Sequence, residues 1–297
     1  MLYNTNSQYG GLKMRVIIDE FLTYLEKKRF SKNTICSYER DIVKFEKYFE
    51  EKQKNIYYLK NEDMEEYLKY LKDEGRTNAT ISRVTASIKA YYKYLLSINL
   101  VERNIVGPNT IYKVERKDFS FLTKRELSEL LEVVKGEDLR NQRDEVMLRI
   151  LYSTGMRVTE LISLRISDIN ISKGKVRVLK NKTKRTLTLD DEAAKSLRNY
   201  ITNIRPLLAR LDSEDWLFYN SVGKSLTRQG FWKILKKYKD ETSIKQEITP
   251  HVLRHSFAIH NLSEGMDIKD LKDILGHTDI ATTMMYTDFM ENNKIEL

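Results

Sequence analysis

Apolar residues recur every three or four positions through most of the first hundred residues of the chain. The repeat runs through four stretches, at 16–29, 31–50, 61–75 and 77–98, which short polar segments separate. This spacing places the apolar side chains on one face of a helix. Four amphipathic helices with short connections are typical of a compact helical bundle. The aromatic residues at these positions are expected in its core rather than at a ligand site.

The helical repeat fades between positions 101 and 120. This segment contains Gly107, Pro108 and a charged run at 113–118, which are features typical of a linker between domains. A chain of 297 residues is also long enough for about two domains. We therefore predict a helical domain over residues 13–101, a linker over 102–120 and a second domain over 121–297.

The second domain is predicted to be mostly helical with a small β-sheet. Thr123 followed by Glu126 is a capping-box pair that starts a helix. Two β-prone segments, at 175–179 and 186–189, flank the basic stretch 180–185, which indicates a hairpin with a basic tip. Only three prolines and eleven glycines occur in the chain, so the predicted fold class is mainly α with a small β-sheet. Further helices are predicted at 127–134, 141–153, 192–204, 227–239, 251–263 and 268–275.

The chain carries 52 Lys and Arg residues against 43 Asp and Glu residues, a net charge of +9. This excess favours an anionic partner, and it is spread over both predicted domains rather than gathered in a tail. If the partner is DNA, both domains are expected to contact it; an ordinary basic surface is the alternative. A single cysteine excludes a disulfide framework and a cysteine-rich metal site. The sequence has no apolar run of membrane-spanning length and no signal peptide, so we expect a cytoplasmic protein.

Three of the four histidines, His251, His255 and His260, fall within ten residues. His251 and His255 are one helical turn apart and form a candidate zinc pair. The intervening Arg254 opposes this interpretation, because a cation beside a metal ligand is unfavourable. The alternative pairs His251 with Arg254 on one helix face, where Arg offers a fork of donors to a phosphate and His transfers a proton near neutral pH.

Two further segments combine a glycine with a candidate site residue. Gly155 breaks a predicted helix, and Arg157 follows at a junction from which its side chain can point into a cleft. Gly276 is suited to end another helix, which places His277 in a tight turn. Tyr286 lies nine residues after His277. Taken alone, Arg157 is better explained as a surface residue, and a packing role on the last helix is the alternative for Tyr286.

Taken together, the candidate residues include cations, histidines and a tyrosine but no acidic cluster. This combination indicates a site that acts on a phosphodiester without a metal ion. Mg²⁺-dependent nucleases need grouped carboxylates instead. Here the cations would neutralise the charge that develops on the phosphate in the transition state. The tyrosine would attack phosphorus and hold it covalently.

The order of these residues resembles the tyrosine recombinase, or phage-integrase, family, and particularly its Xer-type members. Two segments resemble the arginine boxes of the family, TGMRVTEL at 154–161 and PHVLRHSFA at 250–258. LGH at 275–277 and YT at 286–287 complete the pattern, and SKNTICSY at 31–38 resembles the amino-terminal core-binding domain. The resemblance covers nearly the whole chain, and the joint pattern is highly specific.

The resemblance implies a role for each matched residue. Tyr286 is the nucleophile, which forms a 3′-phosphotyrosyl bond and frees a 5′-hydroxyl. Arg157 and Arg254 bind the non-bridging oxygens of the scissile phosphate, and His277 adds a hydrogen bond there. His251 assists proton transfer at the tyrosine.

The other two histidines, His255 and His260, match no residue with a role in the family. We expect His255 to be structural and His260 to be exposed.

The resemblance also implies that a lysine of the predicted hairpin protonates the leaving 5′-oxygen. When the chain is aligned backwards from Arg185, the matching residue is Lys180. When it is aligned forwards from the first arginine box, the match is Asn181, which cannot act as a general acid, so a one-residue deletion is implied in the hairpin. Lys182 is the alternative general acid. Lys182, Lys184 and Arg185 are also candidates for contacts with DNA.

The predicted function is that of a site-specific DNA recombinase. The resemblance implies that two domains clamp double-stranded DNA, and that a tetramer on two synapsed sites exchanges strands through a Holliday junction. Two transesterifications conserve bond energy, so neither ATP nor another cofactor is expected. The sequence leaves open whether the tetramer contains this chain alone or also a second recombinase, and whether a DNA translocase activates it. It also leaves open whether the biological role is chromosome-dimer resolution or mobile-element integration. A type IB topoisomerase-like relaxing enzyme and an inactive DNA-binding regulator are the alternatives.

Overall fold

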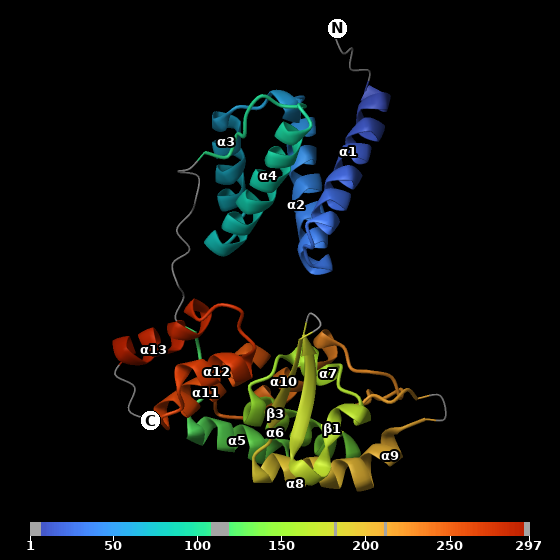
Figure 1. The fold of residues 1–297 in the computed structure, drawn as a ribbon, viewed down its shortest axis with the longest axis vertical. Helices are drawn as coiled ribbons and strands as arrows, with labels where there is room; N and C mark the ends of the chain where they lie inside the picture. The colour runs from blue at the N-terminus through green and yellow to red at the C-terminus, as the bar shows by residue number, and fades with distance from the viewer. Residues whose placement is uncertain (1–6, 108–118, 181–182, 211–212, 294–297) are drawn as a thin grey trace. The chain divides into compact units, whose positions relative to one another are not determined.

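The computed structural model describes residues 7–107, 119–180, 183–210 and 213–293 of the 297-residue chain. The chain divides into two compact units, Met1–Lys117 and Asp118–Leu297 (Figure 1). The elements confirm the predicted fold class, because helices dominate both units and the second unit adds one small sheet. Within the residues described, no helix is both long and apolar enough to cross a membrane.

The first unit is a bundle of helices. Its elements are α1 (Ser7–Lys27), α2 (Lys32–Glu51), the 3₁₀ turn η1 (Ile56–Tyr58), α3 (Asn61–Asp73) and α4 (Asn78–Ser97). α2 packs against both α1 and α4, and α4 also packs against α3. The hydroxyl groups of Ser31 and Thr77 accept hydrogen bonds from the first turns of α2 and α4, which fixes where these helices begin.

Aromatic side chains fill the core of this bundle, as the helical spacing predicts. Phe45 and Tyr67 are buried and meet edge to face, with ring centroids 5.1 Å apart. One carboxyl group, that of Glu46, lies in this core with 5% of the residue exposed and accepts a hydrogen bond from Tyr91 Oη at 3.0 Å. Burial raises the pKa of Glu46 to about 7, and the hydrogen bond from Tyr91 opposes this shift only in part.

We expect the stability of this bundle to fall as the pH rises from about 4.5 through about 7. Glu46 titrates near 4.5 when it is unperturbed and near 7 in the folded chain. Between these values the folded state holds a proton that the unfolded state has released, so rising pH favours unfolding. The shift corresponds to about 3 kcal/mol of unfolding free energy at most. Urea unfolding of the wild type and of Glu46→Gln, whose neutral amide can accept the same hydrogen bond, from about pH 5 to about pH 8.5 checks this. The wild type alone should lose stability over this range, and equal pH profiles would contradict the expectation.

The second unit is built around the long helix α6. α6 packs against α5, α7, α8 and α11, and α11 in turn packs against α12 and α13. Thr123 and Glu126 form the predicted capping box at the start of α5. The helices are α5 (Lys124–Val134), α6 (Leu139–Thr154), α7 (Val158–Ile162), α8 (Asp191–Asn199), α9 (Arg205–Leu208), α10 (Arg228–Asp240), α11 (Pro250–Ser263), α12 (Ile268–Leu275) and α13 (Ala281–Asn293).

The sheet of the second unit is antiparallel, in the order β1 (Ile169–Asn170), β2 (Lys175–Lys180) and β3 (Thr183–Thr188). The predicted basic tip at 180–185 is wrong in its extent, because both strands continue into it and Lys180 pairs with Thr183. Within the strands, Val178 pairs with Arg185. The strand can hold this charged residue on its packed face because the Arg185 guanidinium reaches the buried carboxylate of Glu160.

Candidate active site

The junction between α6 and α7 positions Arg157. Gly155 ends α6 with φ of 57°, a left-handed conformation that favours glycine. A Cβ atom at this position would lie 2.4 Å from the ring of Phe257 on α11, so the close approach of the two helices also requires glycine. Arg157 then starts α7, and its backbone N–H donates to Glu160 Oε2 at 2.8 Å. The side chain of Arg157 is 30% exposed and therefore accessible to a ligand.

Arg254 extends from α11 into the same place and is 5% exposed. Its Nη1 donates to the carbonyl of Gly155 at 2.6 Å, and its Nη2 donates to the carbonyl of Leu275 at 2.7 Å. Arg157 Nη1 donates to the same carbonyl of Leu275 at 3.2 Å. Backbone oxygens at the ends of α6 and α12, which lack partners within their helices, thus hold the two guanidinium groups together.

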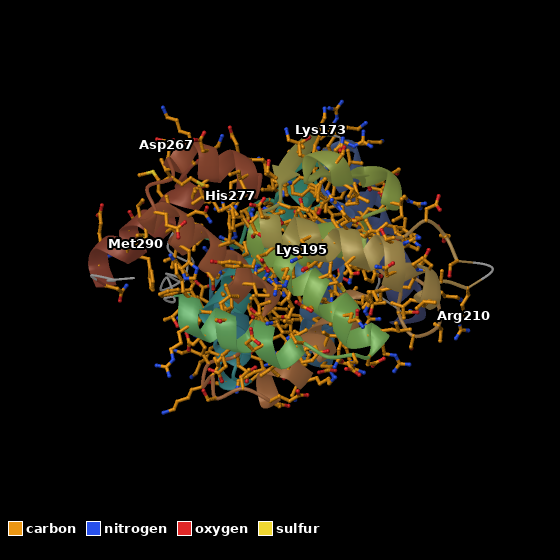
Figure 2. All side chains as sticks on the ribbon, turned by 90° about the horizontal axis from the view of Figure 1, so that it is seen from below. Lys173, Lys195, Arg210, Asp267, His277 and Met290 are labelled. Atoms are coloured by element: carbon orange, nitrogen blue, oxygen red, sulfur yellow. The ribbon has the colours of Figure 1, made fainter. Side chains whose placement is uncertain are left out.

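His277 joins the two arginines from the turn after α12. Gly276 ends α12 with φ of 65°, and His277 (labelled in Figure 2) follows directly. Nε2 of His277 lies 2.9 Å from Arg254 Nη2, and Nδ1 lies 2.8 Å from Thr283 Oγ1. Arginine can only donate, so Nε2 accepts and the proton of the ring lies on Nδ1, toward Thr283.

Tyr286 lies on α13 with 2% of the residue exposed. Its Oη is 2.9 Å from His255 Nδ1. Burial raises the pKa of Tyr286, and the positive charges of Arg254 and Arg157 oppose this shift. The phenol is therefore protonated at neutral pH, next to two guanidinium groups that favour its anion.

The remaining histidines of α11 have distinct environments. His251 is exposed, and desolvation together with the charges of Arg254, Arg228 and Arg157 lowers its pKa. His260 was expected to be exposed; this is wrong, because it is 1% exposed. It faces α6, where Tyr152 Oη lies 2.8 Å from its Nδ1. One face of α11 is fully buried, and residues about four positions apart lie on the same helix face. His260 lies on this face.

His255 is partly buried and also contacts the hydroxyl group of Tyr286. Its pKa falls to about 4, first because the ring is buried and then because His251 and Arg254 lie nearby. It is the histidine that contacts the hydroxyl group of Tyr286. Sequence reasoning missed this contact, because the two residues are 31 positions apart and meet only where α11 packs against α13.

The hairpin residues divide between the two faces of the strands. Lys184 is exposed and pairs with Leu179, which is 64% exposed. Arg185 is 14% exposed. Its Nη1 and Nη2 donate to the two carboxylate oxygens of Glu160, each at 2.8 Å, and its Nε donates to the carbonyl of Ile274 at 3.0 Å. Lys182 and the side chain of Lys180 lie outside the described residues.

Glu160 connects the hairpin with the arginine cluster. It accepts hydrogen bonds from both the Arg185 side chain and the Arg157 backbone. Burial alone would raise the pKa of Glu160, but these hydrogen bonds and the arginine charges outweigh burial and lower it. Glu160 is therefore ionised at neutral pH, and its charge stabilises the hairpin against α7.

The positive charges of the arginine side chains in this site favour binding of an anion. Arg157, Arg254 and Arg228 all lower the pKa of His251, which shows that positive charge is concentrated around the first turn of α11. An anion bound there would relieve the repulsion among these groups. Among the described residues, no group of three or more His, Cys, Asp or Glu side chains is placed to hold a metal ion.

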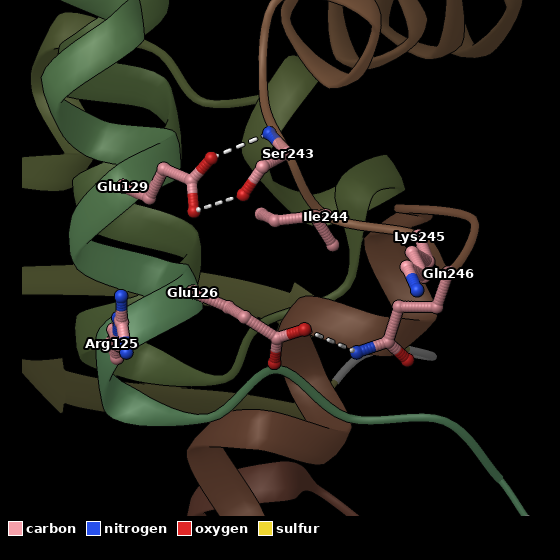
Figure 3. A pocket seen from close by; sticks show the side chains of 7 residues that line it. All are labelled: Arg125, Glu126, Glu129, Ser243, Ile244, Lys245 and Gln246. Carbon is pink, nitrogen blue, oxygen red and sulfur yellow. Dashed lines mark hydrogen bonds between the residues drawn. The ribbon is translucent and has the colours of Figure 1, made fainter.

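A separate hollow lies between α5 and the segment after α10 (Figure 3). Its contacts hold the fold together, because Glu129 accepts hydrogen bonds from the backbone and the hydroxyl group of Ser243 at 2.5 and 3.1 Å. None of the predicted site residues lines it. The lining residues are Arg125, Glu126, Glu129, Ser243, Ile244, Lys245 and Gln246.

The chain is similar in sequence and in fold to known DNA recombinases. Residues 120–293 match the phage integrase family, and residues 18–98 match the phage integrase N-terminal SAM-like domain. Tyrosine recombinase XerD of Staphylococcus epidermidis is 36% identical over 92% of this chain and 94% of its own length. XerD of Oceanobacillus iheyensis is 38% identical over 91% and 92%. In fold, the chain is similar to XerH site-specific recombinase bound to palindromic difH substrate, with a TM-score of 0.75 and 22% identity over 88% of this chain and 79% of that one.

Proposed function

We propose that this chain, which belongs to the phage integrase family and is a site-specific tyrosine recombinase, cuts and rejoins double-stranded DNA through Tyr286. The observation that carries the proposal is the convergence of four side chains from separate segments. Arg157 and Arg254 donate to the same carbonyl of Leu275, and His277 lies against Arg254. The positive charges of both arginines act on the phenol of Tyr286.

The proposed chemistry is a transesterification at phosphorus. The two guanidinium groups bind the scissile phosphate and stabilise the charge that develops on its non-bridging oxygens. In the free protein His277 Nε2 accepts from Arg254, so the hydrogen bond that the resemblance assigns to His277 forms when this ring nitrogen carries a proton and donates it to the phosphate. The phenolic oxygen of Tyr286 forms a bond to phosphorus as the bond from phosphorus to the 5′-oxygen breaks. The phenol loses its proton, a step that the family resemblance assigns to His251, and the 5′-oxygen gains one from a lysine. The product is a 3′-phosphotyrosyl bond, and the reverse reaction with another strand restores the DNA.

The alignment with the family backwards from Arg185 favours Lys180 as the lysine that protonates the 5′-oxygen. In the described part of the hairpin, Val178 and Arg185 are directed into the unit. Lys184 lies on the opposite, exposed face. We therefore propose Lys182 and Lys184 as contacts to DNA phosphates. Arg185, which the sequence suggested for the same role, is instead proposed to hold the hairpin through Glu160.

Lys180→Ala should slow strand cleavage by about 10²- to 10³-fold, the usual contribution of a general acid. A 5′-phosphorothiolate substrate should restore the rate, because a thiolate leaves without being protonated. Single-turnover cleavage of normal and sulfur-substituted DNA measures both effects, with Lys182→Ala as the matched control on the same hairpin. If sulfur rescued Lys182→Ala and not Lys180→Ala, the assignment would be reversed.

We further propose that both units bind the duplex and that a tetramer, of this chain alone or with a second recombinase, joins two sites. The net charge of +9 supports binding to DNA along an extended surface. The similarity to XerD over nine-tenths of the chain supports recombination of the Xer type.

Covalent capture tests the proposed function. The full chain is incubated, without divalent metal, with nicked duplexes made from genomic fragments that it binds. A nick close to the cleavage site lets the short 5′-hydroxyl strand diffuse away, so the covalent complex accumulates. We expect an adduct that survives denaturation, and mass spectrometry of its peptides should place the nucleotide on Tyr286. A nucleotide on another residue would overturn the assignment.

A further inference from the structure

We propose that His255 is a positioning residue for the nucleophile: its Nδ1 accepts the hydroxyl proton of Tyr286 in a hydrogen bond and thereby turns the phenolic oxygen toward the arginines. The inference rests on the proposed function, in which Tyr286 attacks phosphorus. It concerns a residue to which the resemblance assigns no role.

The direction of the proton follows from the partners of the phenol. The positive charge of Arg254 lowers the pKa of Tyr286, and arginine has only donors, so the side of the phenolic oxygen that faces Arg254 presents its lone pairs. Its own proton is left to point at His255 Nδ1, 2.9 Å away. The lone pair that attacks phosphorus is then on the arginine side, where the phosphate binds.

The protonation states of the two rings are consistent with this direction. Burial, His251 and Arg254 keep the imidazole of His255 neutral at neutral pH. Burial keeps the phenol protonated. A neutral imidazole can accept at Nδ1 when its proton is on Nε2. A histidine that is so difficult to protonate is suited to orient the hydroxyl group rather than to remove its proton.

Packing holds the pair in place. The ring of Phe119 lies 4.7 Å from that of His255 and meets the ring of Tyr286 edge to face at 5.1 Å. Phe119 also packs against Phe289, three residues after Tyr286, with ring centroids 4.3 Å apart. These contacts restrict rotation of both rings. The hydrogen bond therefore sets the orientation of a hydroxyl group whose ring is already fixed.

Two substitutions separate positioning from other roles. His255→Asn places an amide oxygen close to where Nδ1 lies but cannot titrate, and His255→Leu keeps apolar bulk under Phe119 without an acceptor. We expect His255→Leu to lower single-turnover adduct formation about 100-fold at saturating DNA, because a misdirected nucleophile costs about that much. His255→Asn should stay within about threefold of the wild type and keep its pH profile, since the acceptor is retained.

The same helix supplies a matched control. His260 also accepts from or donates to a tyrosine hydroxyl, that of Tyr152 at 2.8 Å, but it lies away from the arginines. His260→Leu should lower thermal stability and leave the adduct rate of the folded fraction unchanged. Equal rates for His255→Leu and the wild type would overturn the inference. So would a loss in His255→Asn as large as in His255→Leu, because the ring would then act by exchanging a proton.

The nucleophilic role of Tyr286 and the positioning role of His255 are tested by different results. A nucleotide mapped to a residue other than Tyr286 in the wild type would remove the proposed function and this inference together. An adduct on Tyr286 that forms at the normal rate in His255→Leu would remove this inference alone. Melting temperatures and DNA affinity of each variant show that the compared proteins are folded and saturated.

Discussion

Replacement of Tyr286 by phenylalanine is expected to abolish covalent capture of DNA, while DNA affinity stays within about twofold of the wild type. The change removes one oxygen atom and keeps the ring, which is buried and packed against Phe119. Without that oxygen no bond to phosphorus can form, so the loss should be complete rather than partial. Denaturing gels with labelled nicked duplex measure the adduct, and gel shifts under native conditions measure affinity.

A second tyrosine of the same unit provides the control for this substitution. Tyr152 is half-buried on α6, and its hydroxyl lies 2.8 Å from a histidine of α11, His260. Tyr152→Phe therefore removes a similar tyrosine–histidine hydrogen bond without changing a residue of the arginine cluster. Its adduct rate should equal that of the wild type. An adduct that persists in Tyr286→Phe would show that another residue attacks the phosphate.

The sequence is informative about the parts of the site that lie within single segments. Gly155 and Gly276 mark the ends of two helices, and both adopt the left-handed conformation that a helix end of this kind uses. The residues just after them, Arg157 and His277, are thereby placed at helix ends that face each other. Local signals of this kind are readable because glycine, capping residues and apolar spacing act within a few positions.

The sequence is less informative about contacts that depend on how helices pack. The pair of His255 and Tyr286 exists because α11 lies against α13, and neither segment alone encodes that approach. The burial of His260 depends in the same way on the contact of α11 with α6. The extent of the hairpin was mispredicted because a run of charged residues usually favours a loop. Here Glu160 compensates the inward charge of Arg185 from a segment 25 residues away.

Arg254→Lys is expected to lower strand cleavage about 10⁴-fold although it keeps the charge. Removal of one donor to a developing oxyanion costs about 10²- to 10³-fold, and this substitution disturbs several donors at once. The guanidinium of Arg254 reaches the carbonyls of Gly155 and Leu275 together with Nε2 of His277. A single ammonium nitrogen cannot span these acceptors and also bind a phosphate oxygen.

The loss should appear in the chemical step and not only in stability, because Arg254 fixes His277 as well as the phosphate. Single-turnover adduct formation at saturating DNA, normalised to the folded fraction from urea unfolding, separates the two effects. Arg143→Lys is the matched control: Arg143 is also 5% exposed but pairs with Asp144 and the carbonyl of Tyr219, away from the cluster. Arg143→Lys should lose stability and keep its rate per folded molecule. A rate for Arg254→Lys within about tenfold of the wild type would mean that charge alone, rather than the geometry of the guanidinium fork, stabilises the transition state.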